Sequence, residues 1–209
     1  FTGHKKDIVK SIIRNKLNLN TRNRIYARKC KVKYVDSKEA NMFLENNHLK
    51  GKCKSKLYIG LYYKNLLVSL MSFGKTRTFM NGGKNGINKY ELHRFCNKID
   101  HSIVGGASKI LKMFKSKVNF DELISYYDKS FGYKSFYENI GFYFLSETPI
   151  NYYYIKSGLR KHRYNYNKAK LVKQGYNKYK TEREITKELG IYRIYGPGNY
   201  KYILKSNTW

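Results

Sequence analysis

The sequence predicts an α/β (α+β) fold, in which a mixed β-sheet is flanked by helices and followed by a basic C-terminal appendage of a helix and a hairpin. Strand-like and helix-like stretches follow one another in the order β-α-β-β-β-α-β-α-β-β. Hydrophobic residues make up 41% of the 209 residues and aromatic residues 16%, which is enough to form a core. Beyond Lys156 basic residues and tyrosines replace this pattern. We therefore expect an N-terminal helix and linker (1–24), a main domain (25–158) and a basic extension (159–209).

The first elements follow from periodicity and from capping residues. Apolar residues at helical spacing predict an amphipathic helix over Lys5–Leu17, and the polar residues 18–24 are typical of a linker. Alternation over 29–34 predicts a strand whose lysines face solvent. Asp36, followed three residues later by Glu39, predicts a capping box and a helix to about residue 46 that buries Ala40, Phe43 and Leu44.

The central and C-terminal elements follow from β-rich runs, glycines and apolar stripes. Two runs joined at Lys64-Asn65 indicate a hairpin. A second capping box, Thr181 with Glu184, predicts a helix that ends at Gly190, before a hairpin with its turn at 196–199. The expected strands are 57–63, 66–73, 90–96, 123–127, 142–145, 152–155, 191–195 and 200–204, the expected helices are 107–117 and 133–140, and 81–86 is expected to be a loop.

The charge predicts a polyanionic partner. The chain has 43 Lys and Arg against 14 Asp and Glu, a formal net charge of +29, which a compact protein tolerates best when a polyanion neutralises it. Ten basic residues and one acid lie between Lys156 and Arg183, interleaved with tyrosines that can stack on bases. DNA is the expected partner, and RNA is the alternative. No membrane partner is expected, because no expected helix has a wide apolar face on one side and a basic face on the other. The candidate nucleic-acid contacts are Arg94, Arg160, Lys161, Arg163, Lys168, Lys170 and Lys173.

Several other classes of protein do not fit the sequence. The three cysteines are odd in number and far apart, which excludes a disulfide framework and points to a reducing compartment. They form no CxxC pair, so no metal site is expected. Gly74-Lys75-Thr76 lacks the preceding glycine of a phosphate-binding loop. A metal-dependent nuclease needs converging carboxylates, and acids are sparse here, so no nuclease centre is expected in these residues.

A glycine pair lies between an expected strand and an expected helix. Val104, Gly105, Gly106, Ala107 and Ser108 would let backbone N–H groups approach a pyrophosphate at the helix N-terminus. The same residues would also suit a tight strand-to-helix turn without a ligand. The two interpretations stay open on this feature alone.

Two motifs resemble those of the GNAT acyltransferase family. Val104-Gly105-Gly106-Ala107 is similar to the family's pyrophosphate loop, and Tyr137-x-x-x-Gly141-Phe142 is similar to its closing motif. Within the family, residues 47–49, 90–96 and 125–128 resemble a phage branch that includes Mom-like DNA modification proteins and the part that follows a very-short-patch-repair-like nuclease domain in Hef-like homing endonucleases. Residues 1–24 would then be the end of an upstream nuclease domain. The branch implies a phage-encoded protein of the host cytoplasm or of the virion.

The resemblance implies roles for single residues. Tyr137 would be the general acid that reprotonates a leaving thiolate, and His48 and Asp128 match positions for metal binding or proton transfer. Glu91 is a further catalytic candidate; because it lies three residues from Arg94 on a strand, we expect only one of the two to face a cleft. The implied cofactor is acetyl-CoA. One position departs from the family, since Ser102 replaces the Arg or Gln that opens the loop.

Three functions follow as hypotheses. The first is DNA binding by a GNAT-like module that positions a Hef-like homing endonuclease. The alternative is a Mom-like, acyl-CoA-dependent enzyme that modifies a base in DNA. A second alternative is an RNA-binding or virion-associated protein. The chain would be associated with an endonuclease if a nuclease domain precedes it, and would otherwise be a candidate transferase.

Overall fold

A computed structural model describes residues 5–19, 23–76, 87–131 and 135–206. Contacts divide the chain into two compact units. The first comprises Phe1–Ser125, Ser135–Phe144 and Tyr202–Trp209, and the second comprises Tyr126–Lys134 and Leu145–Lys201. The division into 1–24, 25–158 and 159–209 stays a prediction.

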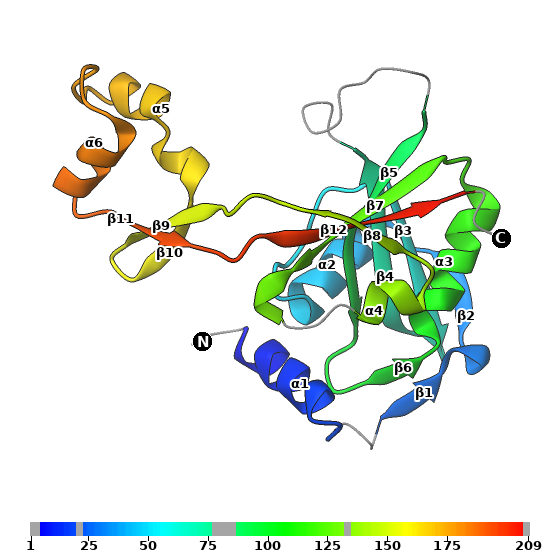
Figure 1. Ribbon diagram of the computed structural model, residues 1–209. Coiled ribbons are helices and arrows are strands. Elements are labelled where there is room, and N and C mark those ends of the chain that lie inside the picture. The colour runs from blue at the N-terminus through cyan, green and yellow to red at the C-terminus, as the bar shows by residue number, and fades with distance from the viewer. Residues whose placement is uncertain (1–4, 20–22, 77–86, 132–134, 207–209) are drawn as a thin grey trace. The chain divides into compact units, whose positions relative to one another are not determined.

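A seven-stranded mixed sheet forms the centre of the fold (Figure 1). Strands β2 to β5 pair antiparallel in succession, whereas β5 and β7 are parallel. In spatial order the strands are β2 (Lys31–Tyr34), β3 (Leu57–Tyr63), β4 (Leu66–Lys75), β5 (Lys89–Asn97), β7 (Glu122–Asp128), β12 (Asn199–Lys205) and β8 (Tyr143–Glu147).

Helices cover both faces of this sheet. Helix α2 (Ser37–Asn47) buries Ala40, Phe43 and Leu44, as predicted, in a cluster that includes Leu70 of β4. Asp36 caps α2 by accepting hydrogen bonds from the N–H groups of residues 38 and 39. Helix α3 (Gly106–Lys117) covers the other face, where the Phe114 ring is stacked 4.2 Å from that of Phe73. The predicted fold class, a mixed sheet flanked by helices, is confirmed.

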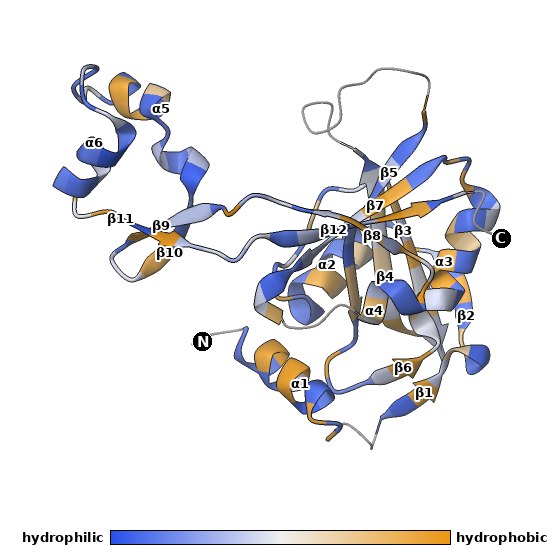
Figure 2. Cartoon of the chain, in the orientation of Figure 1, coloured by the Kyte–Doolittle hydropathy of each residue, from blue (hydrophilic) through white to orange (hydrophobic). Residues whose placement is uncertain are grey.

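The short elements complete the first unit. Helix α1 (Lys6–Lys16), predicted over 5–17, buries Ile8 and Ser11, and the Ser11 hydroxyl accepts a hydrogen bond of 2.8 Å from the N–H of Asp100. Figure 2 shows α1 divided between hydrophobic and hydrophilic residues, as this packing requires. Strand β1 (Arg24–Tyr26) pairs in parallel with β6 (Ser102–Val104), a small sheet that the sequence pattern did not predict. The remaining elements are η1 (Ala27–Lys29) and α4 (Ser135–Asn139).

The predicted hairpin between β3 and β4 is confirmed. Lys64 and Asn65 form its turn with φ angles of +47° and +65°, the left-handed pair that a two-residue type I′ turn needs. The turn therefore sets the pairing of the two most buried strands of the sheet.

The second unit has a three-stranded antiparallel sheet of its own. Strand β9 (Tyr152–Lys156) lies between β10 (Leu159–His162) and β11 (Tyr192–Tyr195). Helix α6 (Glu182–Glu188) begins with the predicted capping box of Thr181 and Glu184. The unit also contains η3 (Lys129–Phe131), η4 (Arg163–Tyr166) and α5 (Lys168–Lys173).

Two strand assignments were wrong. Strand β9 was expected in the main sheet but belongs to the small sheet, and the hairpin of 191–204 does not form because β11 pairs with β9 while β12 lies between β7 and β8. Three consecutive buried residues explain the position of β12, since an inner strand covered on both faces buries successive side chains: Tyr202, Ile203 and Leu204. Strand β9 fully buries only Tyr154.

The remaining expectations concern a loop, a short helix and helices long enough to cross a membrane. The loop of 81–86 lies outside the described residues. Helix 133–140 is confirmed over Ser135–Asn139, while 133 and 134 lie outside the described part. Among the described residues, no helix combines the length and the apolar character needed to cross a bilayer.

Candidate functional site

The glycine turn opens α3 as a contiguous backbone segment. Gly105 has φ +75°, and a Cβ on Gly106 would lie 2.9 Å from Ile103 Cγ2, so both positions require glycine. No side chain caps the helix, and Ser108 is exposed. The Lys109 ammonium instead donates hydrogen bonds to the carbonyls of Ala27, at 3.0 Å, and Cys30, at 2.6 Å. The five predicted cofactor-binding residues, Val104 to Ser108, therefore lie together at one helix N-terminus.

Strands β5 and β7 separate after three residue pairs, the last being Glu91 with Ile124. Tyr137 from α4 is buried at this separation, and its hydroxyl lies 2.8 Å from Ser125 Oγ on β7. Ser125 Oγ also lies 3.3 Å from the Leu92 carbonyl on β5. A serine hydroxyl has one proton, so Ser125 donates either to the Tyr137 hydroxyl oxygen or to the Leu92 carbonyl. When Ser125 donates to Tyr137, the phenolic proton can be given to another group.

A β-bulge in β5 changes the side-chain directions expected from spacing. Gly74 pairs with Glu91 and Ser72 with Arg94, which leaves His93 as the extra residue. Because residues 72 and 74 of β4 share a face, Glu91 and Arg94 also share one. The prediction that they face opposite sides was therefore wrong, since it assumed strict alternation.

The bulge lies beside a polar cluster that the sequence analysis missed. His93 Nδ1 lies 2.8 Å from Ser55 Oγ, and Cys53 Sγ lies 3.4 Å from Ser55 Oγ and 3.3 Å from Ser72 Oγ. Ser55 and Cys53 come from the loop after α2, and no spacing motif joins them to β4 or β5. Only the bulge, which cannot be inferred from alternation, brings His93 to them.

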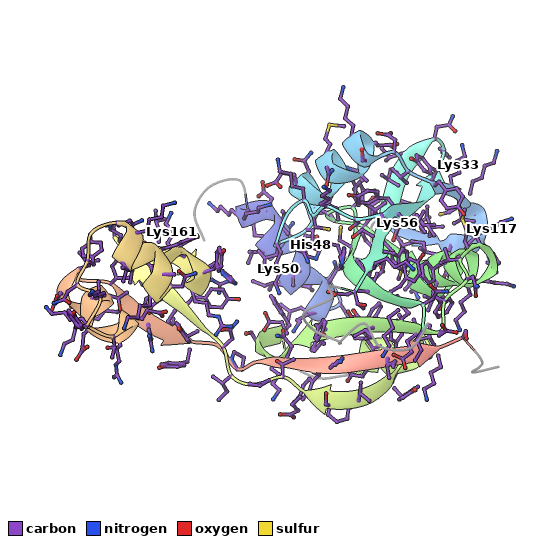
Figure 3. All side chains as sticks on the ribbon, turned by 90° about the horizontal axis from the view of Figure 1, so that it is seen from above. Lys33, His48, Lys50, Lys56, Lys117 and Lys161 are labelled. Atoms are coloured by element: carbon purple, nitrogen blue, oxygen red, sulfur yellow. The ribbon has the colours of Figure 1, made fainter. Side chains whose placement is uncertain are left out.

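His48 follows α2 and lies among cations (Figure 3). Burial lowers the pKa of His48 to about 4, assisted by the charges of Arg94, Lys50 and Lys5. Its Nδ1 accepts a hydrogen bond of 3.0 Å from the backbone N–H of Lys50. The neutral ring therefore carries its proton on Nε2 and presents a donor at pH 7. This geometry suits hydrogen bonding to an acceptor better than removal of a proton.

The catalytic candidates do not all belong to one unit. His48, Glu91 and Tyr137 lie in the first unit, and Asp128 lies in the second, where its Oδ1 accepts a hydrogen bond of 3.0 Å from the N–H of Ser130. Within the described residues, no three His, Cys, Asp or Glu side chains gather as metal ligands. The roles of these residues stay predictions.

Six of the seven predicted nucleic-acid contacts lie in the second unit. All are exposed except Lys170, which is half-buried with its ammonium 4.1 Å from the centre of the Tyr164 ring. They are Arg160, Lys161, Arg163, Lys168, Lys170 and Lys173. Arg94 differs, because it is half-buried on β5 of the first unit and donates from Nη1 to the His93 carbonyl. The exposed Lys33, Lys56 and Lys117 stand on separate parts of the first unit (Figure 3).

Acidic side chains of the second unit are held in internal contacts. The Glu182 carboxylate accepts hydrogen bonds from the hydroxyls of Tyr152, at 2.8 Å, and Tyr154, at 2.6 Å, and from Arg193 Nη2, at 3.2 Å. The other acids pair with nearby side chains or backbone groups: Asp128 with Ser130, Glu147 with Lys129, Glu184 with Thr181 and Glu188 with Lys180. The acids of this unit are thus all engaged in local contacts, and Glu147, Glu182 and Glu188 are paired with basic side chains.

Comparison with known proteins finds similarity among solved structures, and the one described below has low sequence identity. No family model and no curated protein matches the chain. Among solved structures, the chain is similar to the crystal structure of a Bacillus subtilis acetyltransferase in complex with CoA, with 11% identity and a TM-score of 0.45. The match covers 85% of this chain and 99% of that one.

The two motifs that resemble those of the GNAT family lie on defined elements of the first unit. The glycine turn opens α3, which covers the sheet, and the Tyr137-x-x-x-Gly141-Phe142 motif joins α4 to β8. The parallel strands β5 and β7 separate at Tyr137. The chain therefore has a mixed α/β fold in which the residues of both motifs lie beside the large sheet.

Proposed function

We propose that the chain binds double-stranded DNA through its second unit, as the module that positions a Hef-like homing endonuclease. The main support for this proposal is the excess of basic over acidic side chains in this unit. Between residues 145 and 201 the sequence has 13 Lys and Arg against 4 Glu. Each of these glutamates is held by neighbouring side chains, whereas the basic side chains from 160 to 173, apart from Lys170, are exposed. Such a surface suits phosphates, while the nuclease setting rests on the sequence resemblance.

Replacement of Lys161, Arg163 and Lys168 by alanine together tests this proposal. Loss of about three phosphate contacts is expected to lower the affinity for duplex DNA on the order of 100-fold at 0.1 M salt and to reduce the salt slope by about 2.7. Binding is measured by fluorescence anisotropy with a labelled duplex at several salt concentrations.

The matched control removes three exposed lysines from the first unit, Lys38, Lys54 and Lys56. It has the same net charge as the test variant, and its affinity is expected to stay within a few-fold of that of the unmodified chain. Equal losses in both variants would contradict the assignment to the second unit. A stronger competition by single-stranded RNA than by duplex DNA would favour the RNA-binding alternative.

Acyl-CoA-dependent base modification is a second candidate, because the first unit has groups that fit CoA. The uncapped N–H groups of α3 can bind a pyrophosphate. Ser69 Oγ and Asn97 Oδ1 are buried without a hydrogen bond among the described residues, on the sheet face that α3 covers. Bound acetyl-CoA would supply an activated acyl group. The Tyr137 hydroxyl would then give its proton to the departing thiolate, and the hydroxyl of Ser125, as a donor to the Tyr137 oxygen, would stabilise the phenolate that remains.

Mass spectrometry of nucleosides from co-expressed DNA tests the second candidate. A modified nucleoside is expected with the unmodified chain, and its amount is expected to fall when Tyr137 is replaced by Phe, which removes only the hydroxyl. The variant should keep its affinity for DNA, because Tyr137 is buried in the first unit. DNA that contains only unmodified nucleosides in every condition would exclude this function.

A further inference from the structure

The small sheet of the second unit has one face covered by helices and one face open. Register places Tyr154, Lys161 and Arg193 on the same face, and helix α6 covers it through the contacts of Glu182 with Tyr154 and Arg193. The ring of Tyr166 from η4 adds to this cover, 5.1 Å from that of Tyr154. The helices of the unit thus lie on this side of the sheet.

The opposite face has a different composition. Register places six side chains on it: Tyr153, Ile155, Arg160, His162, Tyr192 and Ile194. Arg160 and His162 are exposed, Tyr192 is 65% exposed and Ile194 is 49% exposed. None of the six is acidic. Exposed apolar and aromatic side chains on a sheet face are typical of an interaction surface, and the absence of acids among these six suits a polyanion.

Arg160 is fixed on this face by an aromatic ring. Its guanidinium carbon lies over the Tyr153 ring, 4.2 Å from the ring centre, in a cation–π contact. The His162 ring meets the same tyrosine at 6.1 Å, and its Nδ1 accepts a hydrogen bond from the N–H of Tyr164. A guanidinium held over a ring has fewer accessible orientations, and its planar fork can still donate two parallel hydrogen bonds. Less side-chain entropy is then lost when it binds a base edge.

The spacing of the strands determines how the sheet can approach the DNA major groove. Three strands about 4.8 Å apart place the outer strands about 10 Å from each other. The major groove of B-DNA is about 12 Å wide. The commonest specific contact in it is an arginine that donates two hydrogen bonds to one guanine, at O6 and N7. Tyr192 and Ile194 supply apolar surface suited to thymine methyl groups. Stacking of unpaired bases fits less well, because Arg160 already covers a face of the central Tyr153 ring.

We propose that the open face formed by β10, β9 and β11 enters the major groove of double-stranded DNA, with Arg160 reading a guanine. This inference rests on the proposed DNA binding and adds base recognition to it. Lys161, the next residue on β10, lies on the other face, so it adds positive charge to the unit but does not face the base edges.

Selection from a library of random duplexes with the full chain tests the inference. The unmodified chain is expected to enrich sequences with at least one fixed guanine. Arg160→Ala is expected to lower the preference for that guanine about tenfold to hundredfold, with other positions retained. Arg160→Lys keeps the charge but has no planar fork, so it should lose the preference while its salt slope stays unchanged. The matched control, Lys161→Ala, should weaken all duplexes alike.

The outcomes separate the two levels of the proposal. Duplex binding without any base preference, or a guanine preference that Arg160→Ala leaves intact, would overturn the inference and leave DNA binding in place. A preference for single-stranded over duplex DNA would also overturn it. Absence of duplex binding at low salt would overturn the proposed function itself.

Discussion

Replacement of Glu182 by alanine is expected to unfold the second unit. Its carboxylate holds Tyr152, Tyr154 and Arg193 together, and Tyr154 is fully buried. Removal of the carboxylate leaves two tyrosine hydroxyls and a half-buried guanidinium without their acceptor. Loss of one partner from such a network costs about 3 kcal/mol, a large part of the stability of a small unit. The exposed cations of residues 160–173 would then lose their fixed arrangement, and DNA affinity should fall with them.

Hydrogen exchange is the direct measurement, because it reports on each strand. Peptides that cover β9 and β11 should lose protection in Glu182→Ala, while peptides from β3 and β4 keep theirs. Glu188→Ala is the matched control, since its bridge with Lys180 is exposed and is worth less than about 1 kcal/mol. Equal protection of β9 in the two variants would show that the carboxylate network does not stabilise the unit.

Local patterns predict most elements of this chain, because each rests on neighbouring residues. The helix caps at Asp36 and Thr181 and the turn at Lys64-Asn65 are set by residues within one turn of each other. The choice of partner for a strand, in contrast, is not set by neighbouring residues in the sequence. The segments 152–156 and 199–205 both read as strands, but alternation alone does not tell which joins the large sheet. Burial of three successive residues in β12 is the signal that distinguishes them.

The candidate site shows the same division between local and non-local information. The glycine turn and Tyr137 are found by motifs, since their residues are adjacent in sequence. The cluster of Cys53, Ser55, Ser72 and His93 is not, because a loop, a strand and a bulge contribute to it. Strict alternation predicts opposite faces for Glu91 and Arg94, but a bulge adds one residue to the strand and reverses the expected faces beyond it, so the two residues share a face.

The pKa of His48 predicts that the first unit loses stability as pH falls. The ring has a pKa of about 4 in the folded chain and near 6.5 when unfolded. Between these values the unfolded state binds a proton that the folded state does not, so the free energy of unfolding decreases from above pH 6.5 down to pH 4. The shift corresponds to about 3 kcal/mol at most. The pKa of His48 is low mainly because the ring is buried. The positive charges of Arg94, Lys50 and Lys5 lower it further, since they repel a protonated ring.

His48→Asn isolates this contribution. The asparagine Oδ1 can accept the hydrogen bond from the N–H of Lys50 that His48 Nδ1 accepts now, but it does not titrate. Urea unfolding of both chains at intervals from pH 7.5 to pH 4 should show that the unmodified chain loses more stability than the variant over this range. Carboxylates titrate in both chains, so their effect cancels in the difference. Parallel curves would mean that His48 is solvated and keeps its ordinary pKa, and an NMR titration of its Cε1 proton would then show a midpoint near 6.5.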